Sequence, residues 1–185
     1  MASGQGAESP TPVEKFLGAH PAALAFVQAP KPAPVSYGTE EYFGVSAFKL
    51  VDKNGTVTFV RYKIVPDAGV ETLSTETLAT KDASYLSSEL AERLNQGPVG
   101  FKLTAQVAEE GDVTDDATVH WPESRKVVEL GSVKLEKLVE DNEKEAKHII
   151  FDPIPRVEGV EASDDPLLEL RAALYLISGR ERRAA

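Results

Sequence analysis

Four residues near the C-terminus share one face of a predicted helix and have the chemistry to bind a metal. Arg171, Tyr175, Ser178 and Arg182 are spaced by four, three and four residues, and such positions stack along one side of an α-helix. An arginine held beside a tyrosine favours the phenolate, and phenolate is a ligand for ferric iron. The same spacing is typical of an amphipathic helix whose tyrosine packs in a core and whose basic end suits the helix dipole. Spacing alone leaves both interpretations open.

The elements that must position this face begin with helices and a hairpin. The apolar spacing between Pro12 and Gln28 predicts a helix that His20-Pro21 divides into two pieces. Residues 42–51 and 56–65 are rich in aromatic and β-branched residues, and Asn54-Gly55 lies between them. Asn-Gly between two such runs is a strong hairpin signal.

The rest of the chain continues this mixture of strands and helices. The pattern predicts a helix over 82–95, strands over 99–108, 127–138 and 149–151, a proline-rich loop over 152–166 and a last helix from Pro166 to the C-terminus. We therefore expect a disordered leader at residues 1–12, followed by one α+β domain at residues 13–185.

Composition excludes several classes of function. The 185 residues include no cysteine, which removes disulfides, thiolate zinc sites and iron–sulfur clusters. The net charge of −10 disfavours nucleic acid and anionic membranes as partners. No apolar run approaches the roughly 20 residues that cross a bilayer. These features predict a soluble, cytoplasmic protein.

Other chemistry-bearing residues have simpler interpretations. His20, His120 and His148 lack metal-ligand spacing. The acidic cluster between Glu109 and Asp116 fits no calcium loop, so we expect a solvated turn. The single tryptophan, Trp121, is interpreted as a packing anchor.

Three segments in a fixed order resemble the haem-dependent catalase superfamily, and most closely its short catalase-related peroxidases. Residues 42–51 followed by Asn54-Gly55 resemble the family's Gly-x-His-Thr-Phe hairpin. Residues 151–153 and 159–165 resemble the loop before its proximal helix. The Arg171-x-x-x-Tyr175-x-x-Ser178-x-x-x-Arg182 pattern resembles that helix, where a threonine is usual in place of the serine. The resemblance implies part of an antiparallel catalase-like β-barrel with inserted and C-terminal helices.

The resemblance also implies a role for each residue of the helix face. Tyr175 would be the axial ligand of the iron of haem b, as phenolate, and Arg171 would stabilise that phenolate. Asp165 matches a carboxylate that supports this arginine, while Ser178 and Arg182 match polar residues near the haem. Ser46 stands where the family has a histidine between arginine and carboxylate, which places the tuning of the phenolate in question.

The resemblance begins after the part of the family that carries the distal histidine and asparagine. We therefore expect this chain to supply the proximal side of a haem site, and we assign none of its residues as the catalytic base. The implied function is oxidoreductase chemistry on hydrogen peroxide or an organic hydroperoxide, with a small organic electron donor. The alternative is a non-catalytic, truncated haem-binding or interaction module. Because part of a barrel exposes unpaired strand edges, we expect a homo-oligomer or association with a chain that supplies the distal half.

Overall fold

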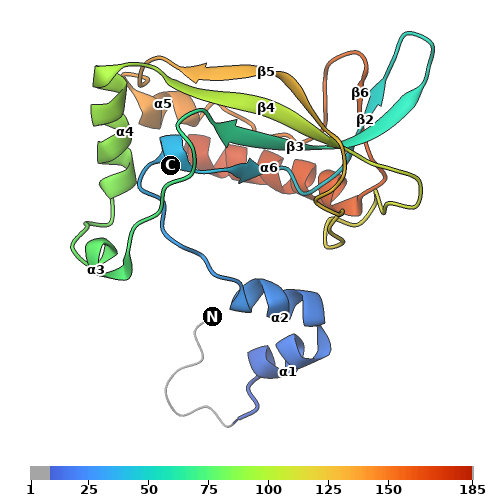
Figure 1. The fold of residues 1–185 in the computed structure, drawn as a ribbon, viewed down its shortest axis with the longest axis horizontal. Coiled ribbons are helices and arrows are strands. Elements are labelled where there is room, and N and C mark those ends of the chain that lie inside the picture. The colour runs from blue at the N-terminus through green and yellow to red at the C-terminus, as the bar shows by residue number, and fades with distance from the viewer. Residues whose placement is uncertain (1–8, 185) are drawn as a thin grey trace. The chain divides into compact units, whose positions relative to one another are not determined.

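The computed structural model describes residues 9–184, and the chain divides into two units at residues 32 and 33 (Figure 1). The described part of the first unit contains helices α1 (Pro12–Ala19) and α2 (Pro21–Gln28). The Thr11 side chain accepts a hydrogen bond from the Glu14 amide and begins α1, and Pro21 begins α2. The predicted division at His20-Pro21 is confirmed. Most of the predicted leader, residues 1–8, lies outside the described residues.

The second unit is built on a six-stranded antiparallel sheet with helices around it. Five strands follow the order β5-β4-β3-β2-β6, and β1 also pairs with β3. Their bounds are β1 (Tyr42–Phe43), β2 (Phe48–Val51), β3 (Val57–Pro66), β4 (Val99–Val107), β5 (Val127–Leu135) and β6 (Val160–Ala162). The other elements are the 3-10 turn η1 (Tyr37–Thr39) and helices α3 (Thr75–Leu78), α4 (Tyr85–Gln96), α5 (Asn142–Ala146) and α6 (Pro166–Ala184). The predicted α+β class is confirmed, and the sheet is open, with β5 and β6 at its edges.

The predicted hairpin forms between β2 and β3. Phe48 pairs with Val60 and Val51 with Val57, and the turn between the strands is closed by the Gly55 amide, which donates to the Asp52 carbonyl oxygen. Gly55 has a φ of +82°, which explains why the turn requires glycine. The Asp52 carboxylate also accepts from the amides of Asn54 and Thr56, and these bonds lower its pKa.

Two sequence predictions are wrong, and both concern the segment before α6. Residues 149–151 are not a strand: Ile149 and Phe151 have about half of their surface exposed, at 48% and 54%. The predicted loop over 152–166 instead contains β6, which pairs with β2. Three apolar residues in a row indicated that 149–151 is buried. The strand β6 has only three residues, one of which, Glu161, is charged, so its own sequence did not predict a strand.

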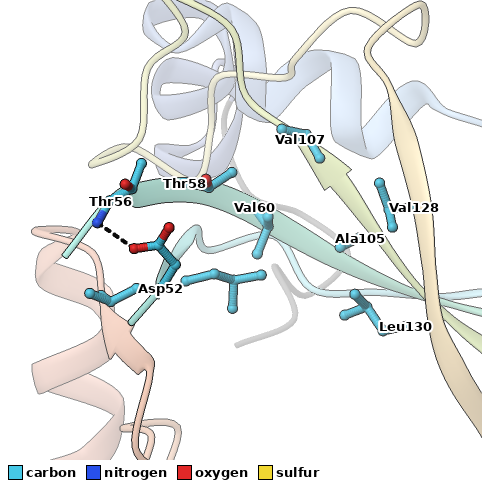
Figure 2. Close-up of a pocket in the computed structure, with 10 residues that line it drawn as sticks. Asp52, Thr56, Thr58, Val60, Ala105, Val107, Val128 and Leu130 are labelled. Atoms are coloured by element: carbon cyan, nitrogen blue, oxygen red, sulfur yellow. Dashed lines mark hydrogen bonds between the residues drawn. The ribbon is translucent and has the colours of Figure 1, made fainter. Parts of the chain in front are cut away.

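One face of the sheet carries an open apolar pocket of about 320 Å³ (Figure 2). Val60 and Ala105 form its floor and are each 1% exposed. Asp52 and Thr56 lie at one end, joined by the bond from the Thr56 amide to the Asp52 carboxylate. The residues that line the pocket include none of the predicted site residues. Because side chains alternate along a strand, Arg61 points to the face opposite Val60.

Candidate functional site

The predicted helix face lies on the more buried side of α6. Leu168 and Gly179 are buried, and Arg171, Tyr175, Ser178 and Arg182 are half-buried along the same stripe. The opposite side is apolar and open: Leu170, Leu174 and Ile177 are each more than half exposed. Asp165 and Pro166 begin the helix, as predicted.

Consecutive turns of this face are joined by hydrogen bonds. The Arg171 guanidinium donates from Nη2 to the phenol oxygen of Tyr175 at 3.4 Å, and it lies 5.5 Å from the centre of the tyrosine ring. One turn further on, Arg182 donates from Nη1 to the Ser178 hydroxyl at 3.1 Å. The predicted pairing of the tyrosine with a guanidinium is therefore present, and the phenol oxygen has its second lone pair available.

The segment before Pro153 packs against this face. The Phe151 ring meets the Tyr175 ring edge-on, with centroids 6.4 Å apart, and the Arg182 guanidinium lies 5.2 Å from the Phe151 ring centre. Arg182 also donates from Nη2 to the Ile149 carbonyl oxygen. Gly179 leaves room for Ile150, because a side chain at that position would meet it. These contacts place an apolar wall beside the phenol.

Asp165 is buried at the start of α6 and is 2% exposed. One carboxylate oxygen, Oδ1, accepts from the Leu167 amide at 2.9 Å, as a helix cap does. The other oxygen, Oδ2, has no hydrogen-bond partner in the described part of the chain. No hydrogen bond joins Asp165 to Arg171 among these residues, so the predicted support of the arginine by this carboxylate stays a prediction.

Ser46 lies in the irregular stretch between β1 and β2. It is 3% exposed, and its hydroxyl has no hydrogen-bond partner within residues 9–184. Its role toward Arg171 likewise stays a prediction.

Sequence reasoning missed Arg61, which is buried in β3. Its Nη1 donates to the Val119 carbonyl oxygen at 2.7 Å and its Nη2 to that of Asp116 at 3.2 Å. The guanidinium also stacks on Trp121, 4.4 Å from the ring centre. The signal in the sequence was an arginine at mid-strand, at a place where the alternation of Val57, Phe59 and Arg61 was already imperfect.

The remaining polar constellations are structural. Trp121 is 6% exposed and donates to the Val113 carbonyl oxygen, which confirms its role as a packing anchor. In the acidic cluster, Arg125 binds Asp112 and Glu109 at 2.8 Å and 2.7 Å. Within residues 9–184, no three His, Asp or Glu side chains are arranged to hold a metal ion. Nor is any helix there long and apolar enough to cross a membrane.

Comparison with known proteins identifies a single family. Residues 16–185 match the model of the family described as catalase. A catalase-related peroxidase of Mycolicibacterium paratuberculosis (strain ATCC BAA-968 / K-10) is 36% identical over 180 residues, which cover 96% of this chain and 57% of that protein. A catalase-related peroxidase of Synechococcus elongatus is 30% identical and is covered to 53%. The chain therefore spans little more than half the length of these relatives.

Solved catalase structures share the fold. A bacterial catalase superposes with a TM-score of 0.76 over 91% of this chain and 35% of its own, at 20% identity. A fungal catalase gives a TM-score of 0.72 over 80% of this chain and 32% of its own, at 25% identity. Most of this chain thus matches about a third of each of these larger proteins.

Proposed function

The chain belongs to the catalase family, and we propose that it supplies the tyrosinate side of a haem site for peroxide chemistry. The observation that carries this proposal is the hydrogen bond from Arg171 to the phenol oxygen of Tyr175 on the half-buried face of α6. The family match and the catalase-related peroxidase relatives support the same reaction class.

The residues on this face suit a ferric haem. A phenolate oxygen is a hard anionic ligand for ferric iron, and a guanidinium beside it offsets the negative charge. The Phe151 ring, edge-on to Tyr175, offers the apolar surface that a porphyrin requires. Arg182 has a buried nitrogen, Nε, with no hydrogen-bond partner within the described residues, which suits an acceptor on a bound ligand.

Each residue has a distinct part in the proposed site. Tyr175 would hold the iron through its phenolate oxygen, and Arg171 would keep that oxygen in place and stabilise its charge. Ser178 and Arg182 would orient polar groups one turn further along α6. Haem, when bound, would supply the electron transfer to hydrogen peroxide or an organic hydroperoxide. A small organic donor would return the electrons.

The second candidate is a haem-binding or interaction module without catalysis. The observation that favours it is the exposure of His20, His120 and His148, since a peroxide-activating base works in an enclosed, partly desolvated site.

Association with another chain is part of the proposal. The edge strands β5 and β6 present unpaired backbone groups, and Leu170, Leu174 and Ile177 form an exposed apolar stripe on α6. We propose that a second copy, or a chain that carries the distal side of the site, covers this surface. Sedimentation velocity of the purified chain tests this, and a monomer at all concentrations contradicts self-association.

Absorbance titration with haemin tests the haem site. The parent chain is expected to give a ferric spectrum with a phenolate-to-iron charge-transfer band, and Tyr175→Phe is expected to lose it. Tyr85→Phe is the matched control. Tyr85 lies on a different helix, α4, and its hydroxyl donates to the Pro34 carbonyl oxygen at 2.8 Å. A spectrum that is the same in parent and Tyr175→Phe contradicts the proposed ligand.

Oxygen release from hydrogen peroxide, and oxidation of a phenolic donor, separate the two candidates. Turnover that depends on both haemin and Tyr175 supports the enzyme. Tyrosine-dependent haemin binding without turnover, measured in the presence of any chain that copurifies, supports the module.

A further inference from the structure

Among the described residues of the second unit, three buried polar side chains have atoms without a hydrogen-bond partner. Ser46, Arg61 and Asp165 are 3%, 8% and 2% exposed, and the atoms concerned are Ser46 Oγ, Arg61 Nε and Asp165 Oδ2. Burying a polar or charged group is costly unless another group balances it. Three such groups in one unit therefore call for a common explanation.

The strand register brings these three residues to one place. The Gly44 amide donates to the Tyr62 carbonyl oxygen, and Phe48 pairs with Val60. Between these two pairings, the three residues 45–47 face the single residue Arg61 of β3. Ser46 is the middle residue of this bulge. On the other side of β2, Phe48 pairs with Ala162, and the chain continues through Ser163 to Asp165. The segment with Ser46 thus lies between the strand of Arg61 and the approach to Asp165.

Arg61 is a buried cation close enough to Asp165 for their charges to attract each other. Burial lowers the pKa of Arg61, and Asp165 is the strongest of the nearby carboxylates that oppose this shift, ahead of Asp112 and Asp116. The neighbouring Asp164 is already paired with Lys49 at 3.1 Å. Arg61 itself is held by the carbonyl oxygens of the loop before Trp121, so its position is fixed independently of Asp165.

Asp165 in turn fixes the start of α6. Its Oδ1 accepts a hydrogen bond from the Leu167 amide, and its carbonyl oxygen accepts one from the Leu168 amide. The Leu168 side chain is buried, at 1% exposed. Arg171 lies within two turns of this cap on the same rigid helix. A displacement of the cap therefore moves the face that carries Arg171 and Tyr175.

We propose that Arg61 is a positioning residue for the proposed haem site: it balances the buried charge of Asp165 across the Ser46 bulge and so fixes where α6 begins. Ser46, in the segment between the two residues, has a hydroxyl that can both donate and accept a hydrogen bond. The pairing of Arg61 with Asp165 stands without haem, whereas its effect on the iron ligand rests on the proposed function.

Amide hydrogen exchange of the full chain without haem tests the pairing. Arg61→Met and Asp165→Asn are each expected to accelerate exchange at the Leu167 and Leu168 amides about tenfold, and the double variant no further, because contacting residues are not additive. Lys63→Met is the matched control: Lys63 lies two residues along the same strand and makes a partly exposed ion pair with Glu41. Additive effects in the double variant, or exchange in Arg61→Met equal to that in Lys63→Met, overturn the pairing.

A variant that keeps the positive charge tests the pairing even if Arg61→Met does not fold. Arg61→Lys retains the cation but not the two-pronged contact with the loop, so the Asp116–Val119 amides are expected to exchange faster while Leu167 stays protected. Equal acceleration at both places shows that Arg61 only supports the loop, which overturns the proposal even if Arg61→Met does not fold.

The spectrum of the haemin-loaded chain tests positioning. Arg61→Met is expected to shift the phenolate-to-iron band and to weaken haemin binding, Arg61→Lys to restore both in part, and Lys63→Met to change neither. An unchanged band and affinity in Arg61→Met overturn the positioning role. If the parent chain binds no haemin, the proposed function fails, and the exchange experiment still decides the pairing.

Discussion

Two regions of the molecule place arginines against aromatic rings, and they differ in how completely their polar groups are satisfied. At the loop between β4 and β5, Arg61 from β3 stacks on Trp121 and donates to two carbonyl oxygens of the loop, and Arg125 within the loop binds two carboxylates. On α6, Arg171 makes one bond of 3.4 Å to Tyr175. Groups held by several bonds stabilise a structure, whereas spare donors and acceptors on a half-buried face remain available to a ligand. The loop is therefore interpreted as structural and the α6 face as the binding site.

The largest expected effect is in the loop. Trp121→Ala is expected to lower the free energy of unfolding by about 3–5 kcal/mol, because it removes a buried indole, its hydrogen bond to Val113 and the stack with Arg61. Urea unfolding followed by circular dichroism measures this loss. Trp121→Phe keeps a ring and is expected to lose less. A loss below about 1 kcal/mol in Trp121→Ala contradicts the structural interpretation of the loop.

On α6, a substitution is expected to affect haemin binding more than folding stability. Arg171→Met is expected to weaken haemin binding about tenfold or more, because a hydrogen bond to a charged group contributes about 1.5–3 kcal/mol. It is expected to cost only about 0.5–1 kcal/mol of folding free energy, the scale of an exposed cation–π contact. Haemin titration and urea unfolding measure the two effects, with Arg180→Met on the exposed side of α6 as control. A large loss of stability in Arg171→Met, with unchanged haemin binding, means that the α6 face is structural and contradicts its interpretation as the binding site.

A pH-dependent effect is expected for the ion pairs of the loop. Hydrogen bonds from Arg125, and then the Glu109 amide, hold the pKa of Asp112 below its usual value of 3.8. Because the folded pKa is lowered, the stability that Asp112 contributes is present above about pH 4 and is lost as the pH falls through the folded pKa. Asp112→Asn is therefore expected to be less stable than the parent at pH 7 and to converge with it as the pH falls below the folded pKa of Asp112. Thermal unfolding across this range measures the difference; Asp115→Asn, an exposed aspartate of the same loop, is the control.

The smallest effect is expected at Ser178. Ser178→Ala removes one hydrogen bond, from Arg182 at 3.1 Å, on a half-buried helix surface. A change within about 0.5 kcal/mol in unfolding free energy is expected, together with a minor change in haemin affinity. A loss of haemin binding as large as that of Arg171→Met means that the hydroxyl, and not the guanidinium, governs the site.

Local signals predicted the elements that carry their own stabilising contacts. The Asn54-Gly55 turn, Pro166 at the start of α6 and the alternation over 99–108 each depend on near neighbours in the chain, and all three were confirmed. The strand at 149–151 was wrong and β6 was missed, because pairing of β6 with β2 joins residues more than a hundred positions apart. Short strands of this kind are decided by their partners and not by their own pattern.

The sequence likewise predicted one part of the candidate site and not the other. The spacing of Arg171, Tyr175, Ser178 and Arg182 follows from helical geometry, so the sequence by itself determined that these side chains share one face. Only the tertiary structure decided that this face is half-buried against Phe151, and that the segment of Ser46 lies between the strand of Arg61 and the approach to Asp165. Burial and the balance of charge depend on segments that the sequence separates widely, and no local pattern encodes them.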